Sequence, residues 1–311
     1  MIIINMKDGL GNQFFEYGFA RYLQKLHGGE KVVINNFFFD GKKRKRYSLH
    51  HFKLSDDIVV AGKFMQLWYT LCFVVRLVTC YKMDFVRWVT SKKRPKGDET
   101  YRKAAKKGMY VNFQAFHAFD IPKSKKRVKF IYGNYENYKY IEPVLDELRK
   151  EFEIKSAPSE ENVKMAQELK ANEAVCVHIR RGDYLDPQWK SLNVCTFDYY
   201  QNAMDEVQRL RPDAKFYVFS NTHKDLEWIK ENYHFKQEVN YVDLGNTDYE
   251  ELRLMSNCSH FIISNSTFSW WAAVLAQNSG KVVVAPEKWI LNNENEDCQG
   301  LYLNDWIKAK I

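Results

Sequence analysis

Short apolar runs alternate with amphipathic stretches along much of the 311-residue chain. An apolar run at 1–6 leads into a glycine turn, and residues 13–27 then carry apolar side chains at helical spacing before Gly28. A second apolar run follows at 31–35. Buried parallel strands are continuous apolar runs, whereas amphipathic helices show a period of 3.6 residues. The chain therefore begins with a predicted strand, helix and strand.

The same alternation returns after residues 156–159, where Ser, Ala and Pro predict a linker. We expect helices at 160–170, 197–210, 224–232, 248–257 and 268–277, and strands at 174–179, 215–219, 238–242, 260–263 and 281–285. This spacing indicates a parallel sheet covered on both faces. We predict an α/β protein with domains at 1–155 and 156–311, and ligands of such sheets bind beyond the carboxyl ends of the strands.

The stretch at 37–129 lacks this alternation, is rich in basic and aromatic residues, and predicts irregular structure. Within it, residues 64–81 are apolar and aromatic but are interrupted by Arg76. A transmembrane helix needs about twenty apolar residues, and a central arginine is costly in one. We interpret the segment as a helix that is either buried in the fold, which we prefer, or lying against a membrane surface.

Composition limits the partners and the compartment. A net charge of +8 favours anionic partners, namely nucleic acid, an acidic membrane face or phosphate-bearing substrates. Basic runs at 42–46, 92–96 and 123–127 are typical of solvated loops. Six scattered cysteines without a C-x-x-C pair indicate a reducing compartment and no structural zinc. With no signal peptide apparent, we expect a cytoplasmic protein, with peripheral contact to the inner membrane left open.

The strongest motif is HIRRGDY at 178–184, directly after a predicted buried strand. A guanidinium at a strand end can hold a pyrophosphate through paired charge-assisted hydrogen bonds, and this stabilises a nucleotide as a leaving group. Arg180 and Arg181 point to opposite faces if the strand continues. We expect one of them to meet the ligand and the other to pair with Asp183. The alternative is an Arg–Asp pair that only closes a turn.

A second motif, SNSTFSWW at 264–271, joins the strand expected at 260–263 to the following helix. Ser and Thr at a helix start cap free N–H groups, and the same amides with the helix dipole form an anion site. The hydroxyls of Ser266 and Thr267 would add donors to phosphate oxygens. Capping alone is the alternative, but two such sites in one domain favour capping together with phosphate binding.

A third motif covers residues 9–15 and resembles a dinucleotide fingerprint only superficially, because Phe14 stands where the third glycine belongs. What remains is a close-approach turn with Asn12 and Gln13 at a helix N-terminus. Their amides suit sugar hydroxyls or a phosphate, and a purely structural turn is the alternative.

Two further signals are weaker. Residues 133–138, GNYENY, either line a ligand site or form an ordinary turn. Glu250 and Glu251 begin a predicted helix, where one carboxylate can accept hydrogen bonds from guanine, or both can complement the helix dipole.

The sequence also lacks several motifs. It has no D-x-D pair, no phosphate-binding P-loop, no G-x-S-x-G and no His/Cys cluster with zinc spacing. We therefore expect no metal ion, with side-chain cations and helix amides in its place.

Together the three motifs resemble the bacterial α-1,2-fucosyltransferases of glycosyltransferase family eleven. The family pattern opens with G-G-L-G-N-Q, met here by residues 8–13 with Asp8 in first place. Its H-x-R-R-G-D-Y is met in full by 178–184 and its N-S-[ST]-F-S-W-W by 265–271. Residues 46–52 look like its Y-x-L-x-x-F segment. The resemblance covers the chain from Met1 to about Trp289.

The resemblance implies a GT-B fold, in which two Rossmann-like domains face each other across a cleft and the C-terminal one holds GDP-fucose. It implies a metal-independent, inverting transfer of L-fucose from GDP-β-L-fucose to the 2-OH of a galactose residue in an oligosaccharide or polysaccharide acceptor. No cofactor is implied beyond the donor substrate.

The resemblance also implies roles for residues. Arg180 would hold the β-phosphate, while Asn12, flanked by Gly11 and Gln13, would face the pyrophosphate or fucose across the cleft. The residues expected to contact the nucleotide are His178, Glu251, Ser266, Thr267 and Phe268, with Glu251 standing where the family usually has Asp. Tyr135, Glu136 and Asn137 are expected on the acceptor side, where a Gln-Ser pair is commoner at 136–137. The candidate catalytic residues are Arg180, Asp183 and Asn12, and Asp183 is in the right motif for a general base unless an arginine holds it.

Three other functions stay open. A fucosyltransferase of another linkage, α-1,6 or protein O-linked, would share H-x-R-R and the Ser/Thr motif but generally not the others. A basic nucleic-acid-binding protein would use the Lys/Arg runs and predicts salt-sensitive binding. A catalytically dead sugar-nucleotide binding module would bind GDP without turnover.

Overall fold

We describe the fold from a computed structural model covering residues 1–39, 46–91, 96–291 and 298–311, with the backbone alone at 82–91 and at Asp183. The chain divides into two compact units. The first contains Met1–Glu153 and a return segment that ends at Leu301, and the second contains Ile154–Asn295 and Tyr302–Ile311. The sequence-based boundary lies between residues 155 and 156, and it did not include the return segment.

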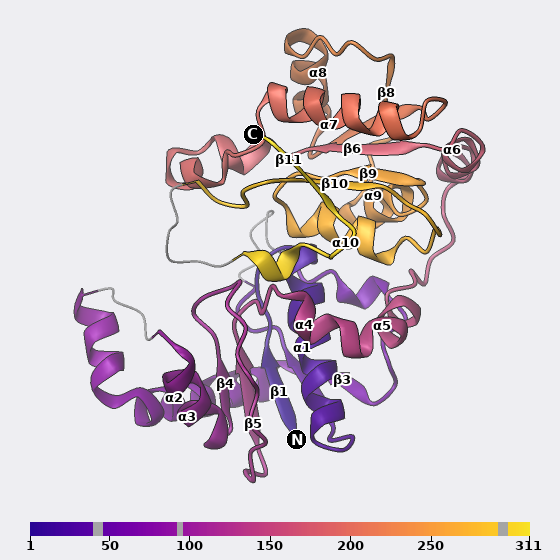
Figure 1. Ribbon diagram of the computed structural model, residues 1–311. Helices are drawn as coiled ribbons and strands as arrows, with labels where there is room; N and C mark the ends of the chain where they lie inside the picture. Colours follow the sequence, from indigo (N-terminus) through magenta and orange to yellow (C-terminus); the bar gives the residue numbers. More distant parts are fainter. Residues whose placement is uncertain (40–45, 92–95, 292–297) are drawn as a thin grey trace. The chain divides into compact units, whose positions relative to one another are not determined.

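The first unit is built on a five-stranded sheet in the order β3-β2-β1-β5-β4, and every strand pair is parallel (Figure 1). Its strands are β1 (Ile2–Asn5), β2 (Val32–Asn35), β3 (Ile58–Val60), β4 (Met109–Val111) and β5 (Lys129–Tyr132). Its α-helices are α1 (Leu10–Leu26), α2 (Lys63–Ser91), α3 (Asp98–Lys106), α4 (Tyr138–Ile141) and α5 (Leu145–Glu151). Short 3-10 turns lie at Leu49–His51, Glu142–Val144 and Gln299–Leu301.

Apolar side chains on both faces of this sheet build its core. On one face, Ile3 and Val33 pack with Phe73 and Leu77 of α2 and with Ala104 of α3. Helix α1 packs against β1, and twelve of its 17 residues are buried. Burial on both faces explains why β1 and β2 are continuous apolar runs.

The second unit is built on a six-stranded sheet in the order β11-β10-β9-β6-β7-β8, again with parallel pairs throughout (Figure 1). Its strands are β6 (Val175–Ile179), β7 (Phe216–Ser220), β8 (Val239–Tyr241), β9 (His260–Ile262), β10 (Val283–Pro286) and β11 (Ile307–Ala309). Its α-helices are α6 (Glu160–Ala171), α7 (Phe197–Leu210), α8 (His223–Asn232), α9 (Asp248–Met255) and α10 (Thr267–Leu275). Two 3-10 turns, Gly182–Leu185 and Pro187–Leu192, follow β6.

Hydroxyl side chains fix where four of these helices begin. Ser159, Thr196, Thr222 and Ser266 each accept a hydrogen bond from a backbone N–H in the first turn of α6, α7, α8 and α10. An N-cap hydroxyl is worth about 1 kcal/mol because it satisfies an otherwise unpaired amide. The helix starts expected from the sequence in this unit therefore agree closely with the structure.

The predicted fold class is confirmed, since two wholly parallel sheets with covering helices form two Rossmann-like units. Two expectations for residues 37–129 were wrong. The stretch is not irregular, because it supplies α2, α3, β3 and β4. The apolar helix at 64–81 is not buried in the fold, because only 22% of its Lys63–Tyr81 segment is buried. It is a helix long and apolar enough to cross a membrane by length and composition alone.

Candidate active site

The carboxyl ends of β6 and β9 lie side by side because the two strands pair directly. His178 on β6 is buried, and its Nδ1 lies 2.9 Å from Oγ of Ser264, the residue that opens the turn after β9. Burial, with a smaller contribution from the positive charge of Arg180, lowers the pKa of His178 to about 3. The imidazole is therefore neutral at physiological pH, with one ring nitrogen donating and the other accepting.

The turn after β9 is held by its own side chains. Ser266 caps α10 by accepting a hydrogen bond from the Phe268 amide at 3.3 Å. Ser269 is fully buried and its Oγ reaches back to the Ser264 and Ser266 carbonyls at 3.3 and 3.2 Å. Asn265 donates to the carbonyls of Leu192 and Trp289, so its amide has a structural task. Thr267 and Phe268, both half-buried, form the first residues of α10.

A further bond joins the two motifs. The hydroxyl of Tyr184 donates to the Asn265 carbonyl at 3.0 Å. Together with the His178–Ser264 contact, it fixes the turn after β6 against the N-terminus of α10. A helix N-terminus carries partial positive charge from its unpaired amides, so this edge of the sheet suits an anion such as a diphosphate.

The two adjacent arginines lie in different surroundings, and β6 ends at Ile179, before both of them. The Arg181 guanidinium lies 3.2 Å from the Trp228 ring centroid, and its Nε is 3.9 Å from Oδ1 of Asp225. Arg181 therefore packs against α8, and its carboxylate partner there is Asp225. The Arg180 guanidinium lies 5.2 Å from the Tyr184 ring centroid, on the motif that borders α10. The side chain of Asp183 lies outside the described residues, so its expected pairing and its role stay predictions.

The two glutamates at the start of α9 also have different surroundings. Glu250 pairs with Nε of Arg253 at 3.1 Å. Glu251 is half-buried, and burial raises the pKa of its carboxyl to about 7, with the negative charge of Asp243 adding to this and a hydrogen bond from Asn246 opposing it. Asn246 and Asp243 lie in the loop after β8, at the same edge of the sheet. Of the two, Glu251 is the carboxylate without a structural ion pair among the described residues.

In the first unit, the glycine turn at 9–13 gives α1 its start at Leu10. Gln13 is fully buried, donates to the Asp8 and Arg46 carbonyls at 3.0 and 2.7 Å, and accepts from the Ser48 amide at 2.9 Å. Its amide therefore makes hydrogen bonds inside the fold, and contact between Gln13 and a donor stays a prediction. Gly11 is buried and Asn12 is half-buried at the same helix start.

Charged residues beside this turn were not expected from the sequence. Glu16 on α1 is buried, its Oε2 accepts from the Lys7 amide at 3.0 Å, and burial raises the pKa of this carboxyl well above its ordinary value. Burial lowers the pKa of Lys7, but the charges of Asp8, Tyr132 and Glu16 outweigh it, and the net shift is upward. A glutamate on the apolar face of a predicted helix was the only signal in the sequence for this cluster.

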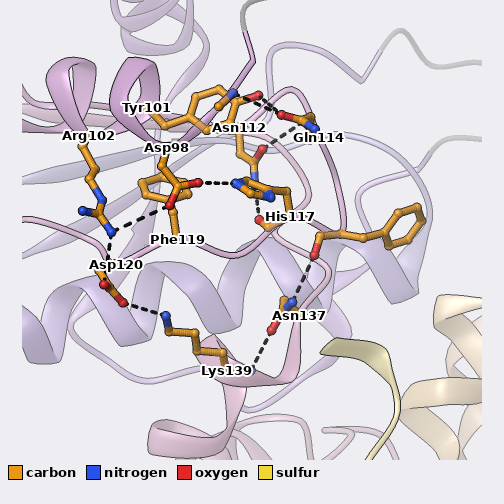
Figure 2. Close-up of polar contacts among 12 residues, drawn as sticks. Asp98, Tyr101, Arg102, Asn112, Gln114, His117, Phe119, Asp120, Asn137 and Lys139 are labelled. Atoms are coloured by element: carbon orange, nitrogen blue, oxygen red, sulfur yellow. Dashed lines mark hydrogen bonds and ion pairs between the residues drawn. The ribbon is translucent and has the colours of Figure 1, made fainter. Parts of the chain in front are cut away.

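The acceptor-side residues lie near the edge of the first sheet. Asn137 is buried, donates to the Phe116 carbonyl at 3.0 Å and caps α4 by accepting from the Lys139 amide at 3.1 Å (Figure 2). Tyr135 is fully buried with φ of 51°, and its ring stacks on Phe19 at 3.5 Å. Both side chains therefore have structural contacts, and their place on the acceptor side stays a prediction. Glu136 is also buried and accepts from Nδ2 of Asn134 at 2.7 Å.

A polar cluster next to Asn137 orders the surrounding loop, as Figure 2 shows. His117 Nε2 lies 2.6 Å from Oδ1 of Asp98, and Nδ2 of Asn112 donates to the His117 carbonyl at 2.9 Å. Asp120 bridges Arg102 and Lys139 at 3.1 and 2.8 Å. These contacts hold the chain between β4 and β5, and they show how the GNYENY segment is kept in its turn.

Among the described residues, one group has the ligand spacing of a metal site, namely His223, Glu227 and Asp243. All three side chains are exposed, and Asp243 raises the pKa of His223 through a hydrogen bond and its charge. Exposed acidic groups of this kind are common on protein surfaces, so the group by itself is not evidence for a metal site.

The chain resembles known proteins over almost its whole length. The family model described as glycosyl transferase family 11 matches residues 1–310. The O-antigen biosynthesis glycosyltransferase WbnK of Escherichia coli is 27% identical over 97% of this chain and 98% of that protein. An alpha-1,2-colitosyltransferase of Escherichia coli is 27% identical over 94% of each chain. Human galactoside alpha-(1,2)-fucosyltransferase 1 is 35% identical over 42% of this chain and 38% of its own.

Proposed function

The chain belongs to glycosyl transferase family 11, and we propose that it transfers L-fucose from GDP-β-L-fucose to the 2-OH of a galactose residue in a glycan, with inversion and without a metal ion. The observation that carries this proposal is the joined pair of turns in the second unit. His178 and Ser264 lie 2.9 Å apart, and this contact brings the Arg180 motif to the N-terminus of α10. The two motifs together offer positive charge and neutral donors to a diphosphate.

In the proposed reaction, the acceptor 2-OH oxygen attacks the anomeric carbon of fucose from the face opposite GDP. The bond from that carbon to the β-phosphate oxygen breaks, and GDP leaves with the electron pair. The hydroxyl proton passes to a general base or to water. Asp183 is our candidate for the base because of its place in the motif. Oxocarbenium character develops at the anomeric carbon, as in glycoside cleavage.

The residues of the second unit would divide the work. Arg180 and the amides and hydroxyls at Ser266 and Thr267 would stabilise the charge that develops on the β-phosphate. The neutral His178 would donate or accept a single hydrogen bond at the nucleotide, with Ser264 fixing its ring. Glu251 would accept from guanine N1–H and N2–H₂, because it is the α9 carboxylate left without an arginine. Phe268 would pack against the nucleotide.

The residues of the first unit have a smaller part in the proposal. Our candidates for contact with the donor remain Gly11, Asn12 and Gln13. Those for contact with the acceptor remain Tyr135, Glu136 and Asn137. No cofactor is proposed beyond the donor. The lack of a D-x-D pair in the sequence supports metal independence.

A colitosyl donor is the second candidate, because a relative that aligns over 94% of this chain is an alpha-1,2-colitosyltransferase. Colitose is fucose without the 3-hydroxyl, so both donors would use the same diphosphate and guanine contacts. Discrimination between the two donors would depend on a hydrogen bond from the protein to that hydroxyl. When the protein group is buried, such a bond can change the ratio of the two kcat/KM values by up to several powers of ten.

The direct test incubates the purified chain with GDP-fucose or GDP-colitose and a panel of β-galactosides, with excess EDTA in parallel. We expect transfer of fucose through an α-1,2 linkage, unchanged by EDTA, and the linkage is determined by NMR of the product. An α-1,6 or protein O-linked product, or a requirement for added metal, would contradict the proposal. Preference for GDP-colitose would replace the donor but keep the site.

A further inference from the structure

Helix α2 carries apolar side chains on the side turned away from the sheet. Eight of them within Lys63–Tyr81 are between 37% and 80% exposed, and we call them the outer stripe: Phe64, Met65, Leu67, Trp68, Leu71, Val74, Val75 and Val78. Their spacing of three and four residues places them along one side of the helix. Large apolar patches are unusual on soluble proteins and mark binding surfaces for proteins or membranes.

The opposite side of α2 is already used. Phe73, Leu77 and Tyr81 are buried in the core of the first unit. Arg76 is also held inward, because its Nη1 donates to the Val128 carbonyl at 2.6 Å and its guanidinium lies 5.5 Å from the Phe130 ring centroid. Helix α2 therefore cannot turn its outer stripe inward without removing its inner side chains from the core.

This inner packing also argues against a spanning helix. A membrane span exposes its circumference to lipid, or to other helices within the bilayer, over about twenty residues. Here the inner side of α2 packs on the parallel sheet of the first unit. An amphipathic helix that lies in the plane of the interface needs only one apolar side, and the outer stripe provides that side.

Basic residues lie near helix α2, on the side of Cys80 that flanks its core-facing residues. We call the exposed cations at the end of α3 and in the loop before β5 the basic edge: Lys106, Lys107, Lys123, Lys125, Lys126 and Arg127. Lys107 and Lys126 lie close enough to α2 for their charges to counter the rise that burial causes in the pKa of Cys80. Among the described residues, no member of the basic edge forms an ion pair, so their charge is available to anionic groups. Lysine and arginine near an apolar stripe can extend toward lipid phosphates.

We propose that the outer stripe of α2 inserts into the headgroup region of an anionic lipid bilayer, with the basic edge contacting the lipid phosphates. The aromatic Trp68 and Phe64 would lie at the interface, where amphipathic and aromatic rings are favoured. A second copy of the chain is the weaker occupant, because a net charge of +8 and an unpaired basic edge repel another copy but attract an anionic surface. The proposal does not depend on the transferase activity.

The test is flotation of the full chain with phosphatidylcholine vesicles that contain roughly one third phosphatidylglycerol, compared with phosphatidylcholine alone. We expect the wild type to float with the anionic vesicles. The variant Trp68→Glu/Leu71→Glu should bind these vesicles more weakly by about tenfold or more. The matched control is Val163→Glu/Leu210→Glu, which places the same charges at exposed apolar positions of α6 and α7 and should bind like the wild type. Lys107→Glu/Lys126→Glu should weaken binding to the anionic vesicles.

Two results would overturn the proposal: no flotation of the wild type with anionic vesicles, or equal flotation of Trp68→Glu/Leu71→Glu. A stable dimer in sedimentation velocity that this variant dissociates, without vesicle binding by the wild type, would assign the stripe to a second copy instead. GDP affinity and transfer to a soluble galactoside should be the same in the stripe variant and its control, so that failure of the docking surface and failure of the proposed function are seen separately. Thermal melting of each variant checks that it is folded.

Discussion

The Nδ1 atom of His178 lies 2.9 Å from Oγ of Ser264, and this buried contact joins the ends of two neighbouring parallel strands. The two residues are 86 positions apart in the chain. Their contact brings the arginine motif and the serine-rich helix start to one edge of the second sheet, where parallel α/β sheets bind ligands. The predictions below test how that edge works.

The two arginines should respond differently to the same substitution. Arg180→Lys removes the planar fork that can hold a phosphate, so we expect kcat/KM to fall by roughly a hundredfold, or about 3 kcal/mol of transition-state stabilisation, with little change in Tm. Arg181→Lys loses the packing on Trp228 instead, so it should lower Tm and leave kcat nearly unchanged. Steady-state kinetics and thermal melting of both variants check this. Near-native turnover by Arg180→Lys and Arg180→Ala together would contradict the assignment.

The hydroxyl of Ser264 should contribute to stability. Ser264→Ala leaves the buried imidazole of His178 without this hydrogen-bond partner, so we expect a loss of about 1–3 kcal/mol in the free energy of unfolding. Ser256→Ala is the control, because that hydroxyl is half-buried and bonds only to the Arg253 carbonyl within its own helix. Urea denaturation compares the two. Equal loss in both variants would mean that the His178 contact has no special weight.

GDP affinity should depend on the charge of Glu251. Guanine N–H groups need an ionised carboxylate, and the pKa of Glu251 in the free protein is raised to about 7. We therefore expect GDP to bind more weakly as the pH falls from 8 to 6 and Glu251→Gln to flatten this dependence. Isothermal titration calorimetry measures both. An affinity for GDP that is independent of pH in the wild type would remove Glu251 from the guanine site.

The raised pKa of Glu251 also affects the stability of the protein, and this effect has the opposite dependence on pH. Because the folded pKa lies above the ordinary value of 4.5, the folded protein binds the proton more tightly than the unfolded chain. This contribution to stability is complete below about pH 4.5 and is lost as the pH rises through about 7. At pH 8, Glu251→Gln should therefore raise the free energy of unfolding by on the order of 1–3 kcal/mol, with no comparable gain at pH 5. Melting curves at the two pH values test the sign.

Asp8 occupies a backbone conformation that favours glycine. Its φ is 63°, directly before Gly9, where a left-handed conformation costs an L-residue roughly 1–2 kcal/mol and costs aspartate somewhat less. We expect Asp8→Gly to raise Tm by a few degrees, since glycine adopts this conformation without that cost. A lower Tm would show that the Asp8 carboxylate supports the buried Lys7–Glu16 cluster.

Tyr135 separates a packing role from an acceptor role. Its hydroxyl is buried with no hydrogen-bond partner among the described residues, while its ring stacks on Phe19. Tyr135→Phe keeps the stack and removes the unsatisfied hydroxyl, so we expect unchanged transfer and equal or higher stability. A rise in the KM for the galactoside acceptor would show instead that the Tyr135 hydroxyl contacts the acceptor.

The sequence was sufficient for the second unit because its local signals agree with the fold. Apolar strands, hydroxyl N-caps such as Thr196 and Ser266, and helical periodicity all point to the same elements. The separation of Arg180 from Arg181 was also expected, but strand alternation is not its cause, because β6 ends at Ile179, before both arginines. Apolar strands, N-caps and helical periodicity depend on residues that are neighbours in the chain, so a single sequence is enough to predict them.

What the sequence did not show depends on distant contacts. The hydrogen-bond partners of Gln13 at Arg46 and Ser48 lie more than thirty residues away. Tyr135 and Asn137 contact Phe19 and Phe116, which only the fold brings to them, and the donor and acceptor roles of these three residues stay predictions. The apolar helix α2 was expected to be buried, yet its outer stripe is exposed, and hydropathy alone does not distinguish the two outcomes.

The central claim is that the turns after β6 and β9 hold the diphosphate of GDP without a bridging metal ion. A crystal structure of the GDP complex, grown with magnesium present, tests it most directly. We predict the β-phosphate within hydrogen-bonding distance of the Arg180 guanidinium and of the Ser266–Phe268 helix start, with no cation between the phosphates. A nucleotide bound away from both turns, or a magnesium ion bridging its phosphate oxygens, would contradict the account.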